Sequence, residues 1–536
     1  MVVALGISVM TVSAAELPVR IAEMARLHLT VPADQPPLKR VEVSPGSASE
    51  GSWLEDPEAR RRLTDVSMPI DWWRWTEVCL SFVPAADGVV DLSLNGPWAE
   101  ASPGVLWRQE VLWDDFEAKG AEFTNGDFTN GIAGWNSPWA DYPAEKEWPM
   151  NGRGLAASWH GRPLVQRLEV KGTQLVELKF RVRAAVPEGF EEPKRLAADT
   201  PAHRACAKLK RGVNLGNGWE AEPGTWGLKY TVEDIDRIAD AGFDHIRVPV
   251  AWHFHFEKGA IGQGLLAELE PVLHRAIERG LFVLLDWHHF EALCEKPELH
   301  RREFVDGWKR IAVHFSDWPP QLFFELLNEP NGALDGDVLN EIHAEALAGI
   351  RESNPKRIVV ANPGGWSVVG SLGRMRLPDE DERVIVSVHC YDPFEFTHQG
   401  AGWVGLEPLK GVVFPGPPAK PLAMPPGLKD RHGFPQWLED YNTMPSEANP
   451  CSAREVERLM AVAAAWSGHF GRPVHLGEFG AFQTGELGSR KRYARAVRKA
   501  AEKHGIPWCW WEWKAGFGCW DAEQGRSVLI DDLIGH

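Results

Sequence analysis

The C-terminal part of the chain, from Arg211 onward, alternates short apolar runs with longer stretches of helical periodicity. Eight runs have the length of buried strands, at residues 211–215, 245–250, 281–286, 321–328, 357–361, 384–389, 473–478 and 507–513. Helical patterns lie between most of them, at residues 231–242, 265–279, 301–315, 337–351, 452–470 and 490–504. Eight strand–helix units over about 325 residues predict an α/β fold, a (β/α)8 TIM barrel spanning residues 211–536. A doubly wound sheet also alternates in this way, but no Gly-x-Gly-x-x-Gly sequence follows the first strand.

The region before the barrel, residues 16–189, has a different pattern. Residues 90–94 and 175–183 alternate apolar and polar side chains, as half-buried antiparallel strands do. We therefore predict a mostly β domain of the sandwich or jelly-roll type here. Residues 190–210 contain Glu-Glu-Pro and Asp-Thr-Pro sequences, which are typical of a connecting segment, and we predict a linker.

The segment from Asn125 to Trp135 resembles the opening of jelly-roll carbohydrate-binding modules, through its Asn-Gly-Asp-Phe sequence and the later Gly-Trp pair. This resemblance implies that the N-terminal domain binds carbohydrate. The chain has 26 Trp and only 5 Tyr, and a flat Trp ring suits stacking on a sugar as well as core packing. The candidates for a sugar platform in this domain are Trp72, Trp73, Trp75, Trp135, Trp139, Trp148 and Trp159. Core packing explains the same tryptophans equally well.

The first 15 residues combine an apolar run with a small-residue end, as a signal peptide does, although they lack its basic start. We interpret residues 1–15 as the remnant of a signal peptide, with a short buried strand or helix as the alternative, and expect a secreted or periplasmic protein. No apolar run reaches the 18 or so residues of a membrane-spanning helix. A net charge of −18 argues against nucleic-acid binding, whereas a neutral polysaccharide remains a suitable partner for a monomer.

Polar and aromatic side chains stand at the ends of six predicted strands. They are Arg247; Asp286, His288 and His289; Asn328 and Glu329; His389 and Tyr391; Glu478; and Trp511. Each has an ordinary structural explanation by itself, but six such strand ends in one barrel indicate an active site. Glu329 and Glu478 each follow a buried apolar run, and one neutral and one ionised carboxyl are what glycosidic bond cleavage requires.

These sequences together resemble glycoside hydrolase family five, the cellulase-type family of retaining barrel enzymes. The resemblance covers about residues 211–520 and rests on Asn328-Glu-Pro, Arg247-Val-Pro-Val, Asp286-Trp-His-His, His389-Cys-Tyr-Asp-Pro, Gly477-Glu-Phe-Gly and Trp511-Glu-Trp-Lys-Ala-Gly-Phe-Gly. It implies that Glu329 is the general acid and then base, and that Glu478 is the nucleophile. The mechanism needs carboxyl groups about 5–5.5 Å apart and retains the anomeric configuration. The acid must stay protonated, and we expect the charge of Glu478 to raise its pKa.

The resemblance also implies supporting roles. Arg247 would hold Glu478 ionised, and Tyr391 would donate a hydrogen bond to it. Asn328 would bind the 2-hydroxyl of the sugar under attack. His288 and His389 would bind sugar or support other side chains, and Trp511 would form the floor of that subsite.

No metal and no cofactor are expected. His288, His289, His253 and His255 invite a metal interpretation, but no His-Glu-x-x-His or comparable carboxylate spacing accompanies them. The predicted function is a retaining endo-β-glycanase, most simply an endo-β-1,4-glucanase. A mannanase, a mixed-linkage glucanase and an exo-β-glucosidase remain alternatives, as does a non-catalytic polysaccharide-binding protein. The long Pro- and Gly-rich segment 391–450 follows the sixth strand, and we expect it to shape one side of the substrate groove.

Overall fold

The computed structural model describes residues 19–32, 34–51, 61–102, 105–136, 155–187 and 189–535. It divides into two compact units, residues 1–192 and 193–536. The predicted signal-peptide remnant lies outside the described residues, as do Trp139 and Trp148. No helix in the described part of the chain has the length and hydrophobicity needed to cross a membrane.

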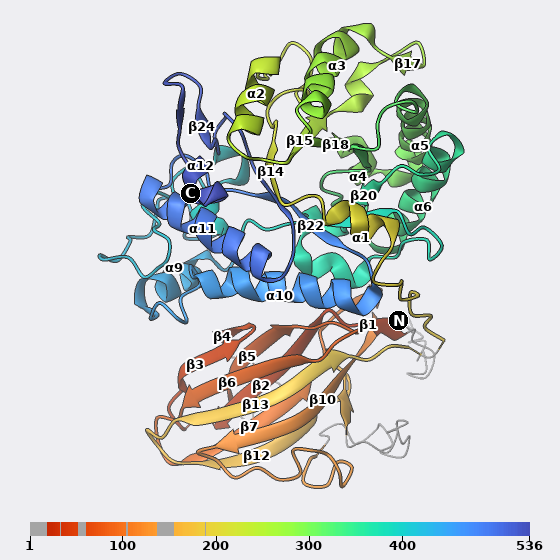
Figure 1. Ribbon diagram of the computed structural model, residues 1–536. Helices are drawn as coiled ribbons and strands as arrows, with labels where there is room; N and C mark the ends of the chain where they lie inside the picture. The colour runs from red at the N-terminus through yellow and green to blue at the C-terminus, as the bar shows by residue number, and fades with distance from the viewer. Residues whose placement is uncertain are drawn as a thin grey trace, which may run out of the picture. The chain divides into compact units, whose positions relative to one another are not determined.

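The N-terminal unit is a β-sandwich, so the predicted fold class of this region is confirmed (Figure 1). One sheet contains β1 (Val19–Ile21), β3 (Lys39–Ser44), β6 (Thr76–Val83), β10 (Arg108–Lys119), β11 (Ala156–Ser158) and β13 (Val176–Ala184). The other contains β2 (Met24–Pro32), β4 (Ser47–Gly51), β5 (Arg61–Pro69), β7 (Gly88–Asn95) and β12 (Leu164–Val170). A separate pair is formed by β8 (Glu100–Ser102) and β9 (Val105–Leu106). The strand orders are β1-β10-β13-β6-β3, with β11 beside β10, and β12-β7-β2-β5-β4.

Alternating side chains give this unit its core. In β2, Leu27, Leu29 and Val31 are buried, while the residues between them are only partly covered. Four of the candidate platform residues, Trp72, Trp73, Trp135 and Trp159, are buried as well, so the expectation that they present a sugar platform is wrong for these four. Trp75 lies beneath the guanidinium groups of two arginines. Burial of large rings stabilises the sandwich, and this accounts for most of its described tryptophans.

The C-terminal unit contains the predicted closed eight-stranded barrel. Its parallel strands are β14 (Arg211–Asn214), β15 (His245–Val250), β18 (Phe282–Trp287), β19 (Leu322–Glu325), β20 (Val359–Ala361), β21 (Val384–His389), β22 (Val474–Phe479) and β23 (Trp508–Trp510). They pair in sequence order, and β23 closes the ring against β14. Strands such as β15 are buried along their whole length because side chains fill the inside and helices cover the outside.

Helices surround the barrel, with the six that the sequence predicts among them in the predicted order (Figure 1). They are α2 (Val232–Asp240), α3 (Gln263–Glu278), α4 (Glu291–Glu295), α5 (Pro297–His314), α6 (Gly336–Ser353), α7 (Gly364–Ser367), α8 (Phe394–Thr397), α9 (Phe434–Thr443), α10 (Ala453–Phe470), α11 (Leu487–Lys503) and α12 (Ile530–Ile534). Short 3-10 helices are η2 (Trp252–His255), η3 (Val369–Arg374) and η4 (Gly402–Val404), and two small hairpins are β16 (Phe256–Glu257) with β17 (Ala260–Ile261) and β24 (Trp520–Asp521) with β25 (Arg526–Ser527). Helix α2 begins with a capping box, in which the Thr231 amide donates to the side chain of Asp234.

The segment treated as a linker contains a further helix, α1 (Pro201–Cys206). Its residues Ala202 and Cys206, followed by Leu209, pack on Leu284 and Phe323 at the start of the barrel strands. The side chain of Thr200 caps the helix by accepting from the amide of His203. The second half of this segment is therefore a structural part of the barrel unit.

Candidate active site

Arg247 in β15 is the centre of the cluster at the C-terminal ends of the barrel strands. Its side chain is 0% exposed. Its Nε and Nη2 donate to Glu325 at 2.8 and 2.9 Å, and Nη1 donates to Asn214 at 3.0 Å. Nη1 also donates to Glu478 at 2.7 Å, and Nη2 to Asn328 at 2.6 Å. A buried guanidinium requires this many acceptors, so Arg247 fixes the four side chains around it.

Asp286 links Arg247 to the aromatic part of the site. Its Oδ2 lies 3.0 Å from Nη2 of Arg247 and 2.7 Å from Nδ1 of His288. Burial lowers the pKa of His288 well below its usual value, so the imidazole is neutral near pH 7. Its ring stacks on Trp511 with centroids 5.2 Å apart and planes 4° from parallel. Gly216 lies against the same indole, where a Cβ atom would stand 2.9 Å from the ring.

Glu478 lies inside β22, near its end, and its side chain is only 5% exposed. Oε1 accepts from Arg247 at 2.7 Å, and Oε2 accepts from the Tyr391 hydroxyl at 2.8 Å. Burial raises the pKa of Glu478; His389 and Arg247 act against that rise, and the charge of Glu329 adds to it. The carboxylate of Glu478 is therefore held by two donors in one orientation.

Glu329 follows β19 by a few residues, and its side chain is 29% exposed, more than that of Glu478. Its Oε1 lies 2.8 Å from Nδ1 of His389. Burial raises the pKa of Glu329 to about 7, against the opposing effects of Arg247 and His289. Burial, and not the charge of Glu478 that we expected, is therefore the cause of the raised pKa of Glu329. The repulsion between the two carboxyls raises the pKa of Glu478 instead.

The two glutamates converge across the barrel. One carboxylate oxygen of each, together with a ring nitrogen of His389, lies within 4.8 Å of the others. In the described part of the chain this is also the one group of three side chains with metal-ligand geometry. The three side chains of this group are already engaged in hydrogen bonds with one another and with Arg247 and Tyr391. The spacing matches a retaining pair of carboxyls and is shorter than the separation that inverting enzymes need.

The eight residues with a predicted role are brought together at one end of the barrel: Arg247, His288, Asn328, Glu329, His389, Tyr391, Glu478 and Trp511. The main chain of Asn328 is held too, since its carbonyl accepts from Nδ2 of Asn362 at 2.8 Å and from Oγ of Ser367 at 2.7 Å. His389 is buried, which lowers its pKa to about 4, so its contact with Glu329 involves a neutral ring.

Sequence reasoning missed several buried polar residues that support the site. Glu325 is a carboxylate within the apolar run of β19, a position that requires a cationic partner such as Arg247. Glu512 accepts from Nδ2 of Asn217 at 2.7 Å and from the amide of Phe517 at 3.2 Å. Burial raises the pKa of Glu512 to about 8. Glu512 directly follows Trp511, so its bonds fix the chain beside the predicted subsite floor.

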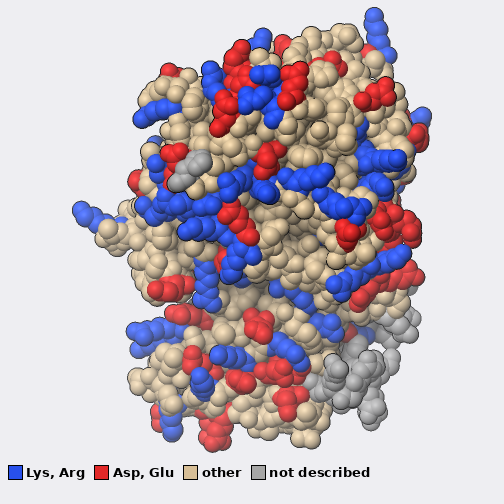
Figure 2. All heavy atoms as spheres, in the orientation of Figure 1, with Lys and Arg blue, Asp and Glu red and all other residues tan. Residues whose placement is uncertain are grey.

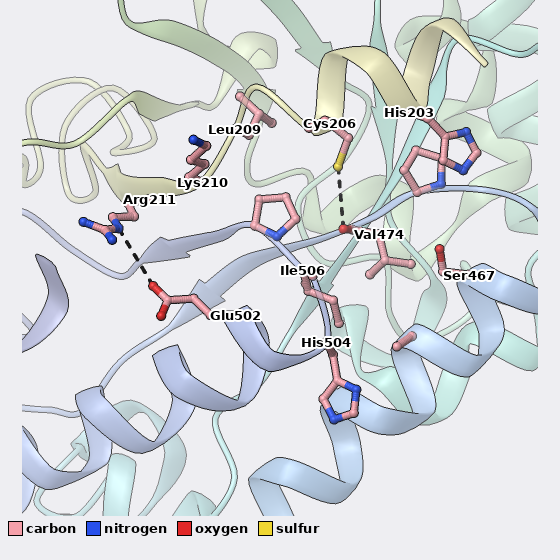
Figure 3. A pocket seen from close by; sticks show the side chains of 15 residues that line it. His203, Cys206, Leu209, Lys210, Arg211, Ser467, Val474, Glu502, His504 and Ile506 are labelled. Carbon is pink, nitrogen blue, oxygen red and sulfur yellow. Dashed lines mark hydrogen bonds and ion pairs between the residues drawn. The ribbon is translucent and has the colours of Figure 1, made fainter. Parts of the chain in front are cut away.

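A cavity of about 610 Å³ lies at the opposite end of the barrel (Figure 3). It is lined by residues that precede or start the strands, including Lys210, Arg211 and Val474, and by Cys206 of α1. Glu502 is the one carboxylate among its lining residues, and it lies 3.8 Å from Arg211. Because it lacks a second carboxyl, this cavity does not compete with the Glu329–Glu478 cluster as a site for glycoside cleavage.

Comparison with known proteins agrees with this geometry. The profile of the family described as cellulase (glycosyl hydrolase family 5) matches residues 209–516. Endoglucanase H of Acetivibrio thermocellus is 26% identical over 321 residues, which are 59% of this chain and 31% of that protein. Endoglucanase 3 of Fibrobacter succinogenes is 26% identical over 375 residues, 65% of this chain and 55% of that protein. The chain thus spans about a third to a half of these two relatives.

Solved structures give the same result for the barrel. Endoglucanase Cel5A of Thermotoga maritima is 32% identical, with a TM-score of 0.54 over 62% of this chain and 100% of that one. The cellulose synthase subunit Z of Clostridioides difficile is 29% identical, with a TM-score of 0.53 over 61% of this chain and 100% of that one. With more than half of the chain matched and the paired carboxyls in place, this protein belongs to glycoside hydrolase family 5, the cellulase family.

Proposed function

We propose that the protein is a retaining endo-β-glycanase, most simply an endo-β-1,4-glucanase, in which Glu478 is the nucleophile and Glu329 the general acid and base. The observation that carries this proposal is the approach of the two carboxylates to within 4.8 Å. At that separation there is no room for a water molecule between an inverting base and the sugar, whereas direct attack by a carboxylate is favoured.

The asymmetry of the two glutamates supports the assignment of roles. Glu478 accepts from Arg247 and Tyr391, and both bonds stabilise its ionised form. Glu329 has a pKa of about 7, which keeps a large share of it protonated near neutral pH. A nucleophile must be ionised and a general acid must hold a proton, so the environments of the two carboxyls fit their roles.

The reaction then proceeds in two displacements. Glu478 attacks the anomeric carbon and forms a glycosyl ester while the glycosidic C–O bond breaks, and Glu329 gives its proton to the leaving oxygen. Water enters, Glu329 removes a proton from it, and the resulting oxygen attacks the anomeric carbon to release Glu478. Two inversions at one carbon give net retention.

Several neighbours are suited to hold the sugar. Oδ1 of Asn328 accepts from Arg247, so its amide NH2 is the group available to a sugar hydroxyl beside the acid. His288 and Trp511 stack on one another and present the apolar floor of the subsite under attack. Trp366, after β20, and Trp403, after β21, are 57% and 64% exposed near the same strand ends, and sequence reasoning did not single them out. Both offer flat faces for further sugar units.

The choice of a glucan rests on the relatives, several of which are named endoglucanases. Cel5A of Thermotoga maritima has been solved in complex with cellobiose and with mannotriose, each described as a substrate of that enzyme. A mannanase, a mixed-linkage glucanase and an exo-β-glucosidase are therefore the alternatives to test. The segment 391–450, which carries Trp403, is part of the proposed groove wall.

The remaining parts of the proposal concern the setting of the enzyme. We propose that it acts outside the cytoplasm, as a monomer, on a polysaccharide, and that the N-terminal sandwich binds carbohydrate. In Figure 2 acidic and basic side chains are intermixed on the visible face, as suits a neutral partner.

Product stereochemistry tests the mechanism. Proton NMR of a freshly started hydrolysis of a cello-oligosaccharide should show the β-anomer first, with the α-anomer appearing only by mutarotation. An initial α-product would contradict the assignment of Glu478 as nucleophile.

A substrate screen tests the specificity. Reducing sugar and product length are measured on carboxymethylcellulose, barley glucan, mannan and xyloglucan, with the E478Q variant as the inactive control. Mixed-length products from carboxymethylcellulose support an endo-β-1,4-glucanase. Release of glucose alone, or activity on mannan alone, would overturn that specificity.

A further inference from the structure

The outward face of the sheet β12-β7-β2-β5-β4 is polar along three adjacent strands. Arg26, His28 and Thr30 of β2 alternate with its buried leucines and valine, so they point away from the core. Register places Ser93 of β7 and Asp65 of β5 on either side of His28. The same alternation in three antiparallel strands therefore places polar side chains next to one another around His28.

Hydrogen bonds connect the side chains of this surface. Nδ1 of His28 lies 3.1 Å from Nδ2 of Asn95, which also donates to Oγ of Ser93 at 3.2 Å. Nε2 of His28 lies 3.4 Å from Oδ1 of Asp65, an atom that is buried and makes no hydrogen bond. Arg26 donates to the other oxygen of Asp65. The planar groups are thus held in place, and Arg26, whose side chain is 42% exposed, uses one guanidinium nitrogen for Asp65 and has further N–H groups to donate.

Trp98 stands at the end of this surface, three residues after β7 ends in Asn95. It is 59% exposed, in contrast to the buried tryptophans of the sandwich. The ring of His160 meets it edge-on, with centroids 4.4 Å apart and planes at 87°. Burial and the nearby charge of His28 lower the pKa of His160, which also ties this pair to the polar surface. A neutral imidazole therefore supports the indole and leaves part of its surface open to solvent.

The arginines and aspartates of this surface pair with one another. Arg26 pairs with Asp65, and Arg167 of β12 binds Asp91 of β7 through two bonds, at 2.7 and 3.0 Å. A balanced set of charges gives no attraction for a polyanion and none for an acidic lipid surface. Planar polar groups that retain bonding capacity, next to one flat apolar ring, match a neutral ligand that has many hydroxyls and apolar CH faces. One ring rather than a row of them suits a single dissolved chain and not a crystalline surface.

We propose that the face formed by Trp98, His160, Asn95, His28, Asp65 and Arg26 is a second, non-catalytic binding site for a single β-linked glucan chain. The sugar stacks on Trp98, and its hydroxyls bond to the side chains of β2, β5 and β7. The choice of a glucan rests on the proposed function of the barrel, whereas the place of the site rests on the sandwich alone.

Calorimetric titration with cellohexaose tests the proposal in the full-length chain carrying E478Q, which prevents hydrolysis. Two molecules should bind per chain, one in the barrel and one on the sandwich. Adding W98A should weaken the sandwich site by about tenfold or more, as loss of a central aromatic contact does, and reduce the measured stoichiometry to one. R26A serves as a second variant and should weaken the same site without removing the ring.

The matched control is L175A, which truncates another exposed side chain of the sandwich and should leave both sites unchanged. Circular dichroism and the unfolding temperature check that each variant is folded. A stoichiometry of one in the E478Q parent, or of two in a folded W98A variant, would overturn the proposal. Hydrolysis by the unmodified chain is measured separately, so a protein that cleaves glucan but binds one cellohexaose refutes this inference and leaves the proposed function standing.

Discussion

Arginine–carboxylate pairs occur both in the barrel and on the sandwich, but they differ in burial. Arg247 is 0% exposed and meets three carboxylates. On the sandwich, Arg26 is 42% exposed and Arg167 61%, and each pairs with one aspartate. A buried charge cluster is rigid, and removing one member leaves the others without compensation. A surface pair rearranges at little cost in free energy.

The difference in burial matches the different functions proposed for the two regions. In the proposed mechanism the barrel cluster holds one carboxylate ionised and another partly protonated within a few ångströms, which requires exclusion of water. The sandwich surface has only to recognise a chain reversibly, and hydrated polar groups are sufficient for that. Variants that change one region and not the other test this difference.

The largest effect is expected from Glu478. E478Q keeps the shape of the side chain but removes the proposed nucleophile, and hydrolysis should fall by on the order of 10⁴-fold or more. Steady-state kinetics on cello-oligosaccharides measures the loss. The smaller E478A variant with added azide should regain turnover and give an α-glycosyl azide. A loss below about tenfold in E478Q would place the nucleophile elsewhere.

Replacement of the acid should have the next largest effect and should depend on the substrate. E329Q is expected to lose about 10²- to 10⁴-fold on cello-oligosaccharides, because these need protonation of the leaving oxygen. As the proposed general acid, Glu329 would act in its protonated form, so the activity of the wild type should fall as the pH rises through about 7. This fall in activity at high pH should be absent in E329Q when the substrate is a dinitrophenyl glycoside, which needs no acid. If the fall persists in E329Q, a group other than Glu329 causes it.

Arg247 and Arg167 offer the most direct comparison of stability. R247A should lower the free energy of unfolding by about 3–5 kcal/mol, since Glu325, Asp286 and Glu478 lose their shared cation. R167A should lower it by less than about 1 kcal/mol because that guanidinium is mostly in water. Urea denaturation followed by fluorescence and circular dichroism gives both values. Equal losses would contradict the contrast between the two regions.

The smallest effect concerns pH and stability. Burial raises the pKa of Glu512 to about 8 and those of Glu220 and Glu329 to about 7, from an ordinary 4.5. The folded protein then binds more protons than the unfolded chain, so stability is lost as the pH rises from 4.5 toward 8. Buried histidines such as His389, with a pKa of about 4, act in the opposite sense up to 6.5. The unfolding temperature should therefore fall between about pH 6.5 and 8.

The matched variant is E512Q, which removes one of these titrations. It should reduce the drop in unfolding temperature over that pH range, whatever its effect at pH 6.5. A drop of the same size in E512Q and the parent would show that Glu512 does not titrate there.

Most of the barrel could be predicted because its strands are buried on both faces and its helices on one. Runs such as 245–250 are apolar enough to be located individually, and the family-like sequences at their ends gave the order of the site residues. The predicted end of the eighth strand at residue 513 was too late, since β23 stops at Trp510. The aromatic run continues past the strand because Trp513 is buried outside it, packed on Trp520.

The parts that escaped prediction depend on contacts between distant segments. Whether a tryptophan is core or surface is decided by its neighbours, and no local pattern separates Trp98 from Trp72. Glu325 supports the site through its hydrogen bonds with Arg247, which lies on another strand, so the role of Glu325 cannot be seen in its own segment. The rise in the pKa of Glu329 comes from its surroundings in the folded protein and not from the charge that sequence reasoning assigned to it.

The barrel unit includes helix α1 and therefore begins earlier in the chain than the region that matches the family. The match begins at residue 209, whereas Ala202 and Cys206 already cover Leu284 and Phe323. In a chain that starts at residue 209, Leu284 and Phe323 at the start of the barrel strands would lose this cover and be exposed to water. Exposed apolar side chains promote aggregation. A shortened chain that keeps this contact must therefore start ahead of Pro201, and any hybrid enzyme that uses this barrel should include the helix.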